Sequence, residues 1–134
     1  MTDTDPPVQP TPAELRILHV LWQRGPSTVR DVHAVVDVER PTGYTTTLKL
    51  LQIMHEKGLV TRDDSARTHV YAAAVTEADT RRQAAADLRD RMFGGSAASL
   101  VQHALSLEPT SRDELRRIRA MLDALESTEE TPDA

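Results

Sequence analysis

The residues best suited to chemistry lie close together in one segment, residues 44–57. The sequence of this segment, YTTTLKLLQIMHEK, predicts an amphipathic helix. Thr45, Lys49 and Gln52 lie roughly opposite its apolar positions, and Thr46 lies towards the edge of the same polar side. Hydroxyl groups at the start of a helix suit contact with phosphates or thymine methyl groups, and a lysine or glutamine further along can reach base edges. This side of the helix therefore indicates recognition of duplex DNA in the major groove.

The same polar side has a simpler interpretation. Threonine, lysine, glutamine and glutamate are what any solvated helix presents to water, so composition alone does not establish contact with DNA. Ile53 is an apolar side chain near this polar side. It could touch a thymine methyl group, but we favour its burial by a neighbouring element. The order of the surrounding elements is what raises the DNA interpretation above the simpler one.

Two further helices are predicted before this segment. The sequence TPAE is a capping box with proline at the first helical position, so a helix begins after Thr11 and ends at residues 25–26, a Gly-Pro pair. Ser27 or Thr28 can cap a second helix, in which four valines are spaced to form a buried stripe. Residues 40–43 contain a proline that disfavours helix before it, and they form the turn into the third helix.

A hairpin is predicted after the third helix. Gly58 is placed to end that helix in the left-handed conformation. Residues 59–62 and 67–71 then read as two strands joined by a polar turn. Arg62 and Arg67 flank the tip, where they could straddle a DNA backbone or enter a minor groove. This order of elements is that of a winged helix-turn-helix, and it predicts a mainly α fold with a two- or three-stranded β wing.

Four segments follow from the pattern along the chain. Residues 1–10 are rich in proline and aspartate and are expected to be a disordered tail. Residues 11–75 form the predicted winged-helix domain. Residues 76–126 read as helices, broken at a Gly-Gly pair and at an EPT linker, and form a helical domain. Residues 127–134 are expected to be a disordered acidic tail.

Composition restricts the functional classes. With one Trp, two Tyr and one Phe, aliphatic side chains must fill the core, which favours helices. The net charge is −5, but residues 11–75 carry eight Lys and Arg against seven Asp and Glu, a balance of +1. The acid therefore lies mainly outside the predicted DNA-binding domain. No apolar run is long enough to span a membrane, and the N-terminus does not resemble a signal peptide, so we expect a cytoplasmic protein without membrane insertion.

Catalytic and metal chemistry find little support in this sequence. The chain has no cysteine, which excludes thiolate sites and disulfides. Its five histidines are spread over different predicted elements, and no pair of them has metal-ligand spacing on one helix. His55-Glu56 begins like a zinc-protease signature, but Leu59 stands where the second ligand would be. We therefore expect no enzyme activity, no metal and no cofactor.

Over about residues 11–125 the sequence resembles the BlaI/MecI penicillinase-repressor family of bacterial winged-helix regulators. The resemblance rests on the order and spacing of several short segments, none of them specific alone. These segments are LW followed by GP and TVRDV within residues 21–32, GYTT at 43–46, EKGLV at 56–60, RTHVY at 67–71 and FGGSA at 93–97.

The resemblance implies a repressor that binds a dyad operator in double-stranded DNA as a homodimer, with one recognition helix in each half-site. Thr45, Thr46 and Lys49 would then face the operator, while Arg62 and Arg67 would belong to the wing. The helices after residue 76 would form the dimer interface. The interface residues that the resemblance implies are Leu88, Met92, Phe93, Leu100, Val101, Leu115, Ile118 and Leu122.

Three departures from the family pattern affect these expectations. Relatives often carry basic residues where this chain has Leu48 and Ile53, so operator affinity or sequence is expected to differ. In antibiotic-responsive members a membrane sensor causes cleavage at an Asn-Phe bond, which aligns with His103-Ala104 here. The resemblance therefore implies a membrane sensor protease as a partner, but the bond at this position does not match the cleaved Asn-Phe bond. Copper-responsive relatives use C-terminal cysteines, which this chain lacks.

An alternative function is a winged-helix module that binds a protein and not DNA. The acidic balance suits this alternative, and the apolar stripe within residues 115–125 is long enough to grip a partner helix, a second copy of itself or its own domain. A salt titration separates the two functions, because binding to several phosphates weakens steeply as salt rises. The sequence does not identify the operator, the regulated genes or the inducing signal.

Overall fold

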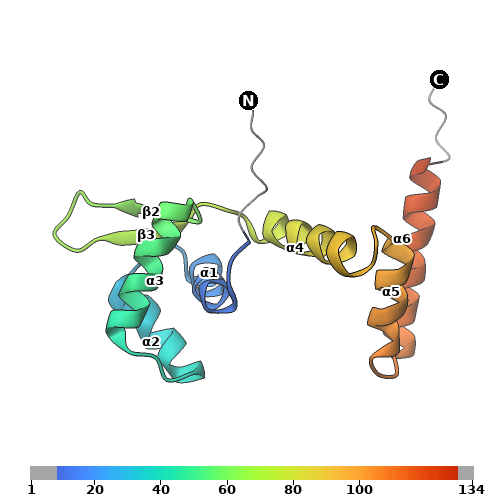
Figure 1. The fold of residues 1–134 in the computed structure, drawn as a ribbon, viewed down its shortest axis with the longest axis horizontal. Helices are drawn as coiled ribbons and strands as arrows, with labels where there is room; N and C mark the ends of the chain where they lie inside the picture. Colours follow the sequence, from blue (N-terminus) through green and yellow to red (C-terminus); the bar gives the residue numbers. More distant parts are fainter. Residues whose placement is uncertain (1–8, 130–134) are drawn as a thin grey trace. The chain divides into compact units, whose positions relative to one another are not determined.

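The computed structural model describes residues 9–129, whose fold is mainly helical with one small sheet (Figure 1). These residues form two compact units, one that ends at Asp87 and one that begins at Leu88. The division lies inside the fourth helix, whereas we predicted a boundary after residue 75. The elements in chain order are α1 Pro12–Arg24, β1 Ser27–Thr28, α2 Val29–Glu39, α3 Tyr44–Lys57, β2 Val60–Asp63, β3 Val70–Ala73, α4 Glu77–Met92, α5 Ala97–Ser106 and α6 Arg112–Glu129.

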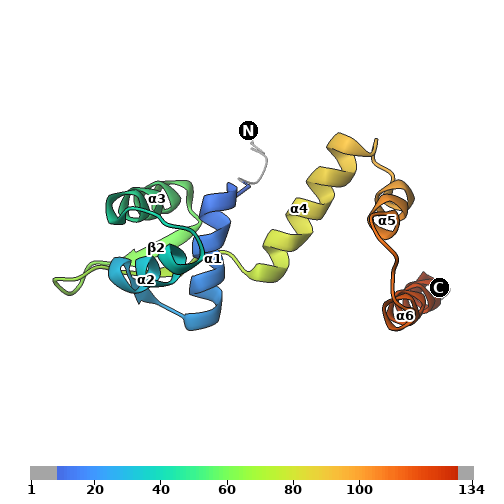
Figure 2. The same ribbon diagram turned by 90° about the horizontal axis from the view of Figure 1, so that it is seen from below.

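The first unit has the predicted winged helix-turn-helix layout. Helices α1, α2 and α3 pack together with an antiparallel sheet of strand order β1-β3-β2 (Figures 1 and 2). The short strand β1 adds a third strand to the predicted hairpin, since Thr28 pairs with Val70. Thr28 is also the N-cap of α2, because its side chain accepts a hydrogen bond of 3.2 Å from the backbone N–H of Asp31. One residue thus joins the sheet to the second helix.

The core of the first unit is built almost entirely from aliphatic side chains, as the composition predicts. Each large apolar side chain that is fully buried contributes roughly 1.5–3 kcal/mol through the hydrophobic effect. The valine stripe of α2 is buried apart from Val35, which is partly buried. The buried core residues are Ile17, Leu18, Val20, Leu21, Val29, Val32, Val36, Leu51, Met54, Leu59, Val60 and Tyr71.

Local signals at the helix ends are confirmed. The capping box of α1 consists of two hydrogen bonds. The Thr11 hydroxyl accepts one from the Glu14 backbone N–H, and the Glu14 carboxylate accepts one from the Thr11 backbone N–H. Gly58 ends α3 in the left-handed region, with φ of 85° and ψ of 11°, where a side chain would be strained. The Leu59 N–H then donates to the Met54 carbonyl over 2.9 Å, which satisfies an end group of the helix. The start of α1 and the end of α3 are therefore determined locally.

The second unit consists of the end of α4 and the helices α5 and α6. Gly94 and Gly95 have φ angles of 58° and 85°, which ends α4 as predicted. Between Leu88 and Thr128 no side chain is buried. Apolar side chains lie at the surface instead, and Met92, for example, is 70% exposed. This unit carries an apolar surface that its own helices do not cover.

The predicted tails need one correction. Residues 127–129, which we expected in the disordered acidic tail, belong to α6. The Thr128 hydroxyl donates to the Ala124 carbonyl over 3.0 Å, so the last turn has a side-chain contact of its own. Residues 1–8 and 130–134 lie outside the described part of the chain. Within residues 9–129 no helix is long and apolar enough to cross a membrane.

Candidate nucleic-acid interface

The outward side of α3 carries the side chains that the sequence singled out. Thr45, Thr46, Lys49 and Gln52 are all exposed, and they lie on one side of a single helix. The opposite side of α3 is buried in the core through residues that include Leu51. Helix α3 therefore presents short hydroxyls near its start and longer donors further along, all of them open to solvent.

We expected Ile53 either to be buried by a neighbouring element or to be open to a thymine methyl group, and its exposure is intermediate. Its side chain is partly buried, so it is neither enclosed in the core nor fully open to solvent. Leu48, where relatives often carry a basic residue, is likewise partly buried and packs against the core. Helix α3 therefore carries no basic side chain at positions 48 and 53, and Lys49 is the one cation on its outward side.

An ion pair between α1 and α3 holds the end of α3. The Nζ of Lys57 lies 2.8 Å from Oε2 and 3.0 Å from Oε1 of Glu14, a residue that is only 2% exposed. The Thr11 backbone N–H also donates to Oε1, over 2.9 Å. Burial by itself raises the pKa of the Glu14 carboxyl, but the hydrogen bonds from Lys57 and Thr11 outweigh it and lower the pKa below its ordinary value. The pair fixes where α3 lies on the first helix.

The start of α3 is held by a second polar contact, to α2. Nδ1 of His33 and the hydroxyl of the buried Thr47 lie 3.2 Å apart. The His33 ring also meets the Tyr44 ring edge to face, with centroids 5.4 Å apart. Contacts at both ends of α3 therefore fix its position against α1 and α2.

The two arginines of the hairpin have different surroundings. Arg62 is partly buried on β2, and its Nε lies 2.8 Å from a carboxylate oxygen of Asp64. Among the described residues this Nε has no hydrogen-bond partner, although the two charges are close. The Tyr71 hydroxyl and Asp64 raise the pKa of the Arg62 guanidinium. Arg67 is exposed beyond the strand and has no ion-pair partner within residues 9–129.

A groove of about 610 Å³ lies between the start of α2, one side of α3 and the hairpin. We call it the wing groove. Arg62, Arg67 and Gln52 all line it, so the structure brings these three predicted residues to one place. Arg30 lines it too, and the sequence analysis missed this residue. Its position in the first turn of α2 was the available signal, since that turn lies beside α3 in the structure.

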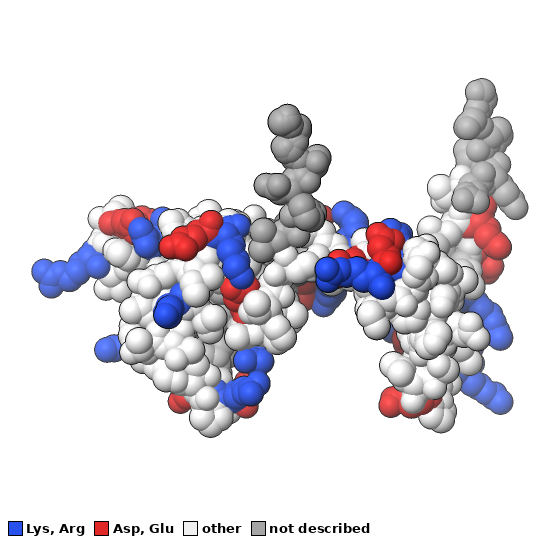
Figure 3. Space-filling view, viewed as in Figure 1, with Lys and Arg blue, Asp and Glu red and all other residues white. Residues whose placement is uncertain are grey.

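On the face that Figure 3 shows, positive charge is distributed in small groups and not as one broad patch. On the face of the first unit seen in Figure 3, basic side chains are scattered among uncharged and acidic ones. Phosphate contacts on such a surface must come from local groups such as the wing groove. Among the described residues no set of three His, Asp or Glu side chains could hold a metal ion.

The predicted interface residues of the second unit lie at its surface or partly buried. An apolar groove of about 900 Å³ separates α5 from α6, and Leu100, Val101, Ile118 and Leu122 line it. We call it the α5–α6 groove. Leu115 is partly buried on α6 outside this lining.

The remaining predicted interface residues belong to the end of α4 and to the residue that follows it. Leu88 and Met92 are exposed on the last turns of α4. The Phe93 ring contacts His103, with ring centroids 5.0 Å apart. The structure therefore groups four of the eight predicted residues around one groove.

Comparison with known proteins gives concordant results. The family model of the penicillinase repressor matches residues 10–124. The transcriptional regulator BlaI of Mycobacterium tuberculosis is 33% identical, with 83% of each chain covered. The methicillin resistance regulatory protein MecI of Mammaliicoccus sciuri is 21% identical over 83% of this chain and 90% of its own length. The solved DNA-binding domain of the repressor BlaI is 22% identical, with a TM-score of 0.49, over 57% of this chain and 93% of that one.

The family match spans both compact units, and so covers the winged helix, the exposed side of α3 and the helices that follow. The order of elements and the spacing of the motifs in the sequence agree with it. This chain belongs to the penicillinase repressor family, the BlaI/MecI group of winged-helix transcriptional regulators.

Proposed function

We propose that the protein is a transcriptional repressor that binds a dyad operator as a homodimer. In this proposal α3 of each protomer lies in the major groove of one half-site. The observation that carries it is the exposed side of α3, where Thr45, Thr46, Lys49 and Gln52 lie together in a winged helix of a repressor family. Repression follows by occlusion, because a protein bound over two successive major grooves blocks access to the promoter.

Each predicted contact has a chemical role in this arrangement. The hydroxyls of Thr45 and Thr46 bind phosphate oxygens or pack against thymine methyl groups, as short side chains at a helix start can. Lys49 donates to a guanine edge or to a phosphate, and Gln52 reaches bases one turn further along. Arg67, at the exposed tip of the hairpin, contacts the backbone beside the groove.

Homodimerisation is supported by the second unit. Its described residues include no buried side chain, yet it carries an apolar groove and several exposed Leu, Met and Val side chains. Exposed apolar surface of this kind marks an interface more often than a solvated face. A second copy of the same surface, related by two-fold symmetry, covers it and produces the symmetry that a dyad operator requires.

The inducing signal lies outside this proposal. By the family resemblance, His103 and Ala104 of this chain correspond to the cleaved bond of antibiotic-responsive relatives. His103 is exposed, and its Nδ1 lies 2.9 Å from the Ser99 carbonyl within α5. A membrane sensor protease as a partner rests on the family resemblance alone, and the residue types at this bond count against it.

The test begins with selection of duplexes from a random-sequence pool by the full chain. A dyad sequence with half-sites about one helical turn apart, at about 10 base pairs, is the expected result. Binding to the selected duplex should weaken steeply with salt, and sedimentation should show two protomers for each duplex. Recovery of no sequence, with no salt-dependent binding to any duplex, would overturn the proposal and leave a protein-interaction module.

A further inference from the structure

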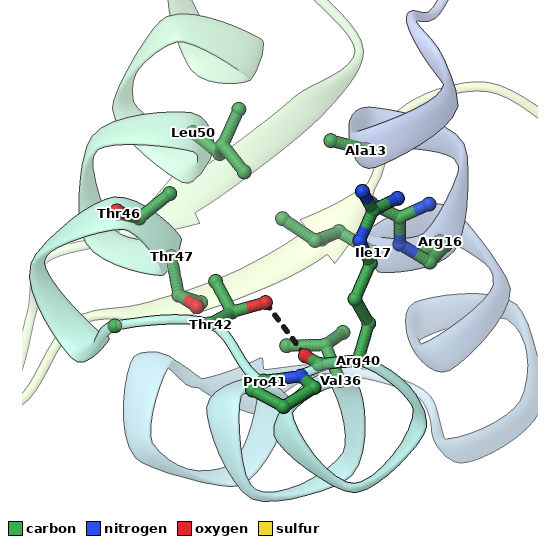
Figure 4. A pocket seen from close by; sticks show the side chains of 11 residues that line it. Ala13, Arg16, Ile17, Val36, Arg40, Pro41, Thr42, Thr46, Thr47 and Leu50 are labelled. Carbon is green, nitrogen blue, oxygen red and sulfur yellow. Dashed lines mark hydrogen bonds between the residues drawn. The ribbon is translucent and has the colours of Figure 1, made fainter.

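A second pocket lies beside α3 and is distinct from the wing groove. It has a volume of about 280 Å³ and lies between α1, the turn at residues 40–43 and the first half of α3 (Figure 4). Arg16 enters it from α1 and Arg40 from the end of α2. We call it the two-arginine pocket. Ile17, Val36 and Leu50 provide the apolar part of its wall.

The charged groups in the lining of this pocket are both positive, and a carboxylate close by, that of Asp37, accepts a hydrogen bond of 2.9 Å from the Thr42 backbone N–H beside the pocket. The lining itself holds two guanidinium groups and no carboxylate. Within the described part of the chain neither Arg16 nor Arg40 has an ion-pair or hydrogen-bond partner for its side chain. Several other arginines are paired, for example Arg81 with Glu77 at 2.7 Å and Arg82 with Asp79 at 3.0 Å, whereas Arg67 also has no ion pair within residues 9–129. Two like charges that share a pocket repel each other, and a bound oxyanion relieves that repulsion while it accepts hydrogen bonds from both.

The other polar groups around the pocket determine which anion fits. The Thr42 hydroxyl already donates to the Arg40 carbonyl over 2.8 Å, so it fixes the backbone of the turn (Figure 4). Thr46 is exposed and lines the pocket, and Gly43 places the start of α3 there. Helix starts favour negative charge. The donors are forked guanidinium groups and a hydroxyl, which suit the several oxygens of a phosphate group.

We propose that the two-arginine pocket binds a phosphate group, supplied by the DNA backbone beside α3. This inference rests on the proposed function, because α3 must lie in the major groove for a backbone to reach the pocket. Thr46 belongs both to the outward side of α3 and to the pocket lining, so the pocket adjoins the side of α3 that would face the DNA. The wing groove lies on the other side of the helix and is lined by Tyr44, Leu48 and Gln52. Arginines therefore lie on both sides of α3, in the two-arginine pocket and in the wing groove. In this proposal each group faces one strand of the DNA major groove.

The test compares the full-length protein with its Arg16→Gln/Arg40→Gln variant on two duplexes, the selected dyad duplex and a random-sequence duplex of equal length. If each protomer of the variant neutralises one phosphate fewer, the slope of log affinity against log salt falls by about 1.8 for a dimer. Affinity should fall about tenfold or more on both duplexes, because a phosphate contact carries no sequence information. The matched control is Arg81→Gln/Arg82→Gln, which removes the same charge from α4 and should change the slope little.

A second arm identifies the phosphate. Single phosphates of the selected duplex are replaced, one at a time, by neutral methylphosphonates. The original protein should lose affinity when the replacement is at one or two positions in each half-site. At those positions the Arg16→Gln/Arg40→Gln variant should show no further loss of affinity, because it no longer binds that phosphate. Equal losses for the original protein and the variant at every position would overturn the inference.

A third arm separates a backbone phosphate from a free one. Inorganic phosphate is titrated into the isotope-labelled protein, and amide shifts near Thr42 and Thr46 are followed. One outcome would be equal binding of both duplexes by the variant and the original protein, with amide shifts on addition of inorganic phosphate only in the original protein. The pocket would then hold a free anion, and the proposal that the phosphate comes from the DNA backbone would be overturned. If the original protein binds no duplex, the proposed function fails instead, so the two failures are distinguishable.

Discussion

At the scale of single residues, the two lysines of the chain have opposite surroundings. Lys49 is exposed and has no ion-pair partner among the described residues, whereas Lys57 is paired with the buried Glu14. The Lys49→Ala variant should lose affinity for the selected duplex by about tenfold to a hundredfold, since one good base contact is worth about 1–3 kcal/mol. Its free energy of unfolding should stay within about 0.5 kcal/mol of the original. Unchanged anisotropy titrations would remove Lys49 from the interface.

The Lys57→Ala variant should show the opposite behaviour. Removal of Lys57 leaves the Glu14 carboxylate buried with the Thr11 donor only, and we expect a loss of about 1–3 kcal/mol in the free energy of unfolding at neutral pH. This is below the loss for a fully buried pair, because the Lys57 side chain is 31% exposed. DNA affinity at a temperature where both proteins are folded should change less than in Lys49→Ala.

The dependence of this effect on pH follows from the pKa of Glu14. Its folded pKa lies below the ordinary value of 4.5, so its contribution to stability is fully present above 4.5 and is lost as the pH falls through the folded pKa. In the Lys57→Ala variant the lysine no longer stabilises the Glu14 carboxylate, so burial should raise the pKa of Glu14 above its value in the original protein. Urea unfolding should therefore show a large difference between the two proteins at pH 7 and a smaller one below pH 4.5. A difference that is constant with pH would show that the ion pair is not its source.

At the scale of elements, the two arginines of the hairpin differ in their surroundings. Arg62 lies close to Asp64 and Tyr71, whereas Arg67 is exposed. Arg67→Ala should reduce the salt slope by about 0.9 for each phosphate that the arginine neutralises, and it should leave the unfolding temperature unchanged. Arg62→Ala removes the neighbour of Asp64 and Tyr71 and should lower the unfolding temperature. Equal salt slopes for Arg67→Ala and the original protein would show that the hairpin tip does not touch DNA.

The helix ends show how much local sequence determines an element. Thr11 and Glu14 predicted the start of α1, and Gly58 predicted the end of α3, because each signal depends only on neighbours in the chain. The strand β1 was not predicted, because two residues are too short to show an alternating pattern. Its pairing with β3 is made between residues far apart in sequence.

At the scale of the whole molecule, assembly is the property to test. Charge placed in the α5–α6 groove by Ile118→Asp or Leu122→Asp should produce monomers in sedimentation experiments, because the apolar surface can no longer pair with its copy. The first unit should stay folded, since its core includes no residue of α6. Leu107→Asp is the matched control, because Leu107 is 82% exposed and does not line this groove. Dimers that persist in both groove variants would place the interface elsewhere.

The amino-acid sequence alone determined the order of the elements, the helix ends, the aliphatic core and the polar side of residues 45–52. These properties depend on periodicity and on neighbours, which a single chain displays directly. Only the tertiary structure decided which arginines line the same pocket and which side chains lie next to each of them. Arg16 and Arg40 are separated by a whole helix in sequence and meet in one pocket, while Arg62 lies close to Asp64 and Tyr71 and Arg67 stays free of ion pairs within residues 9–129. Such neighbours arise when α1, α2 and α3 pack around a common core, and no local pattern records that packing.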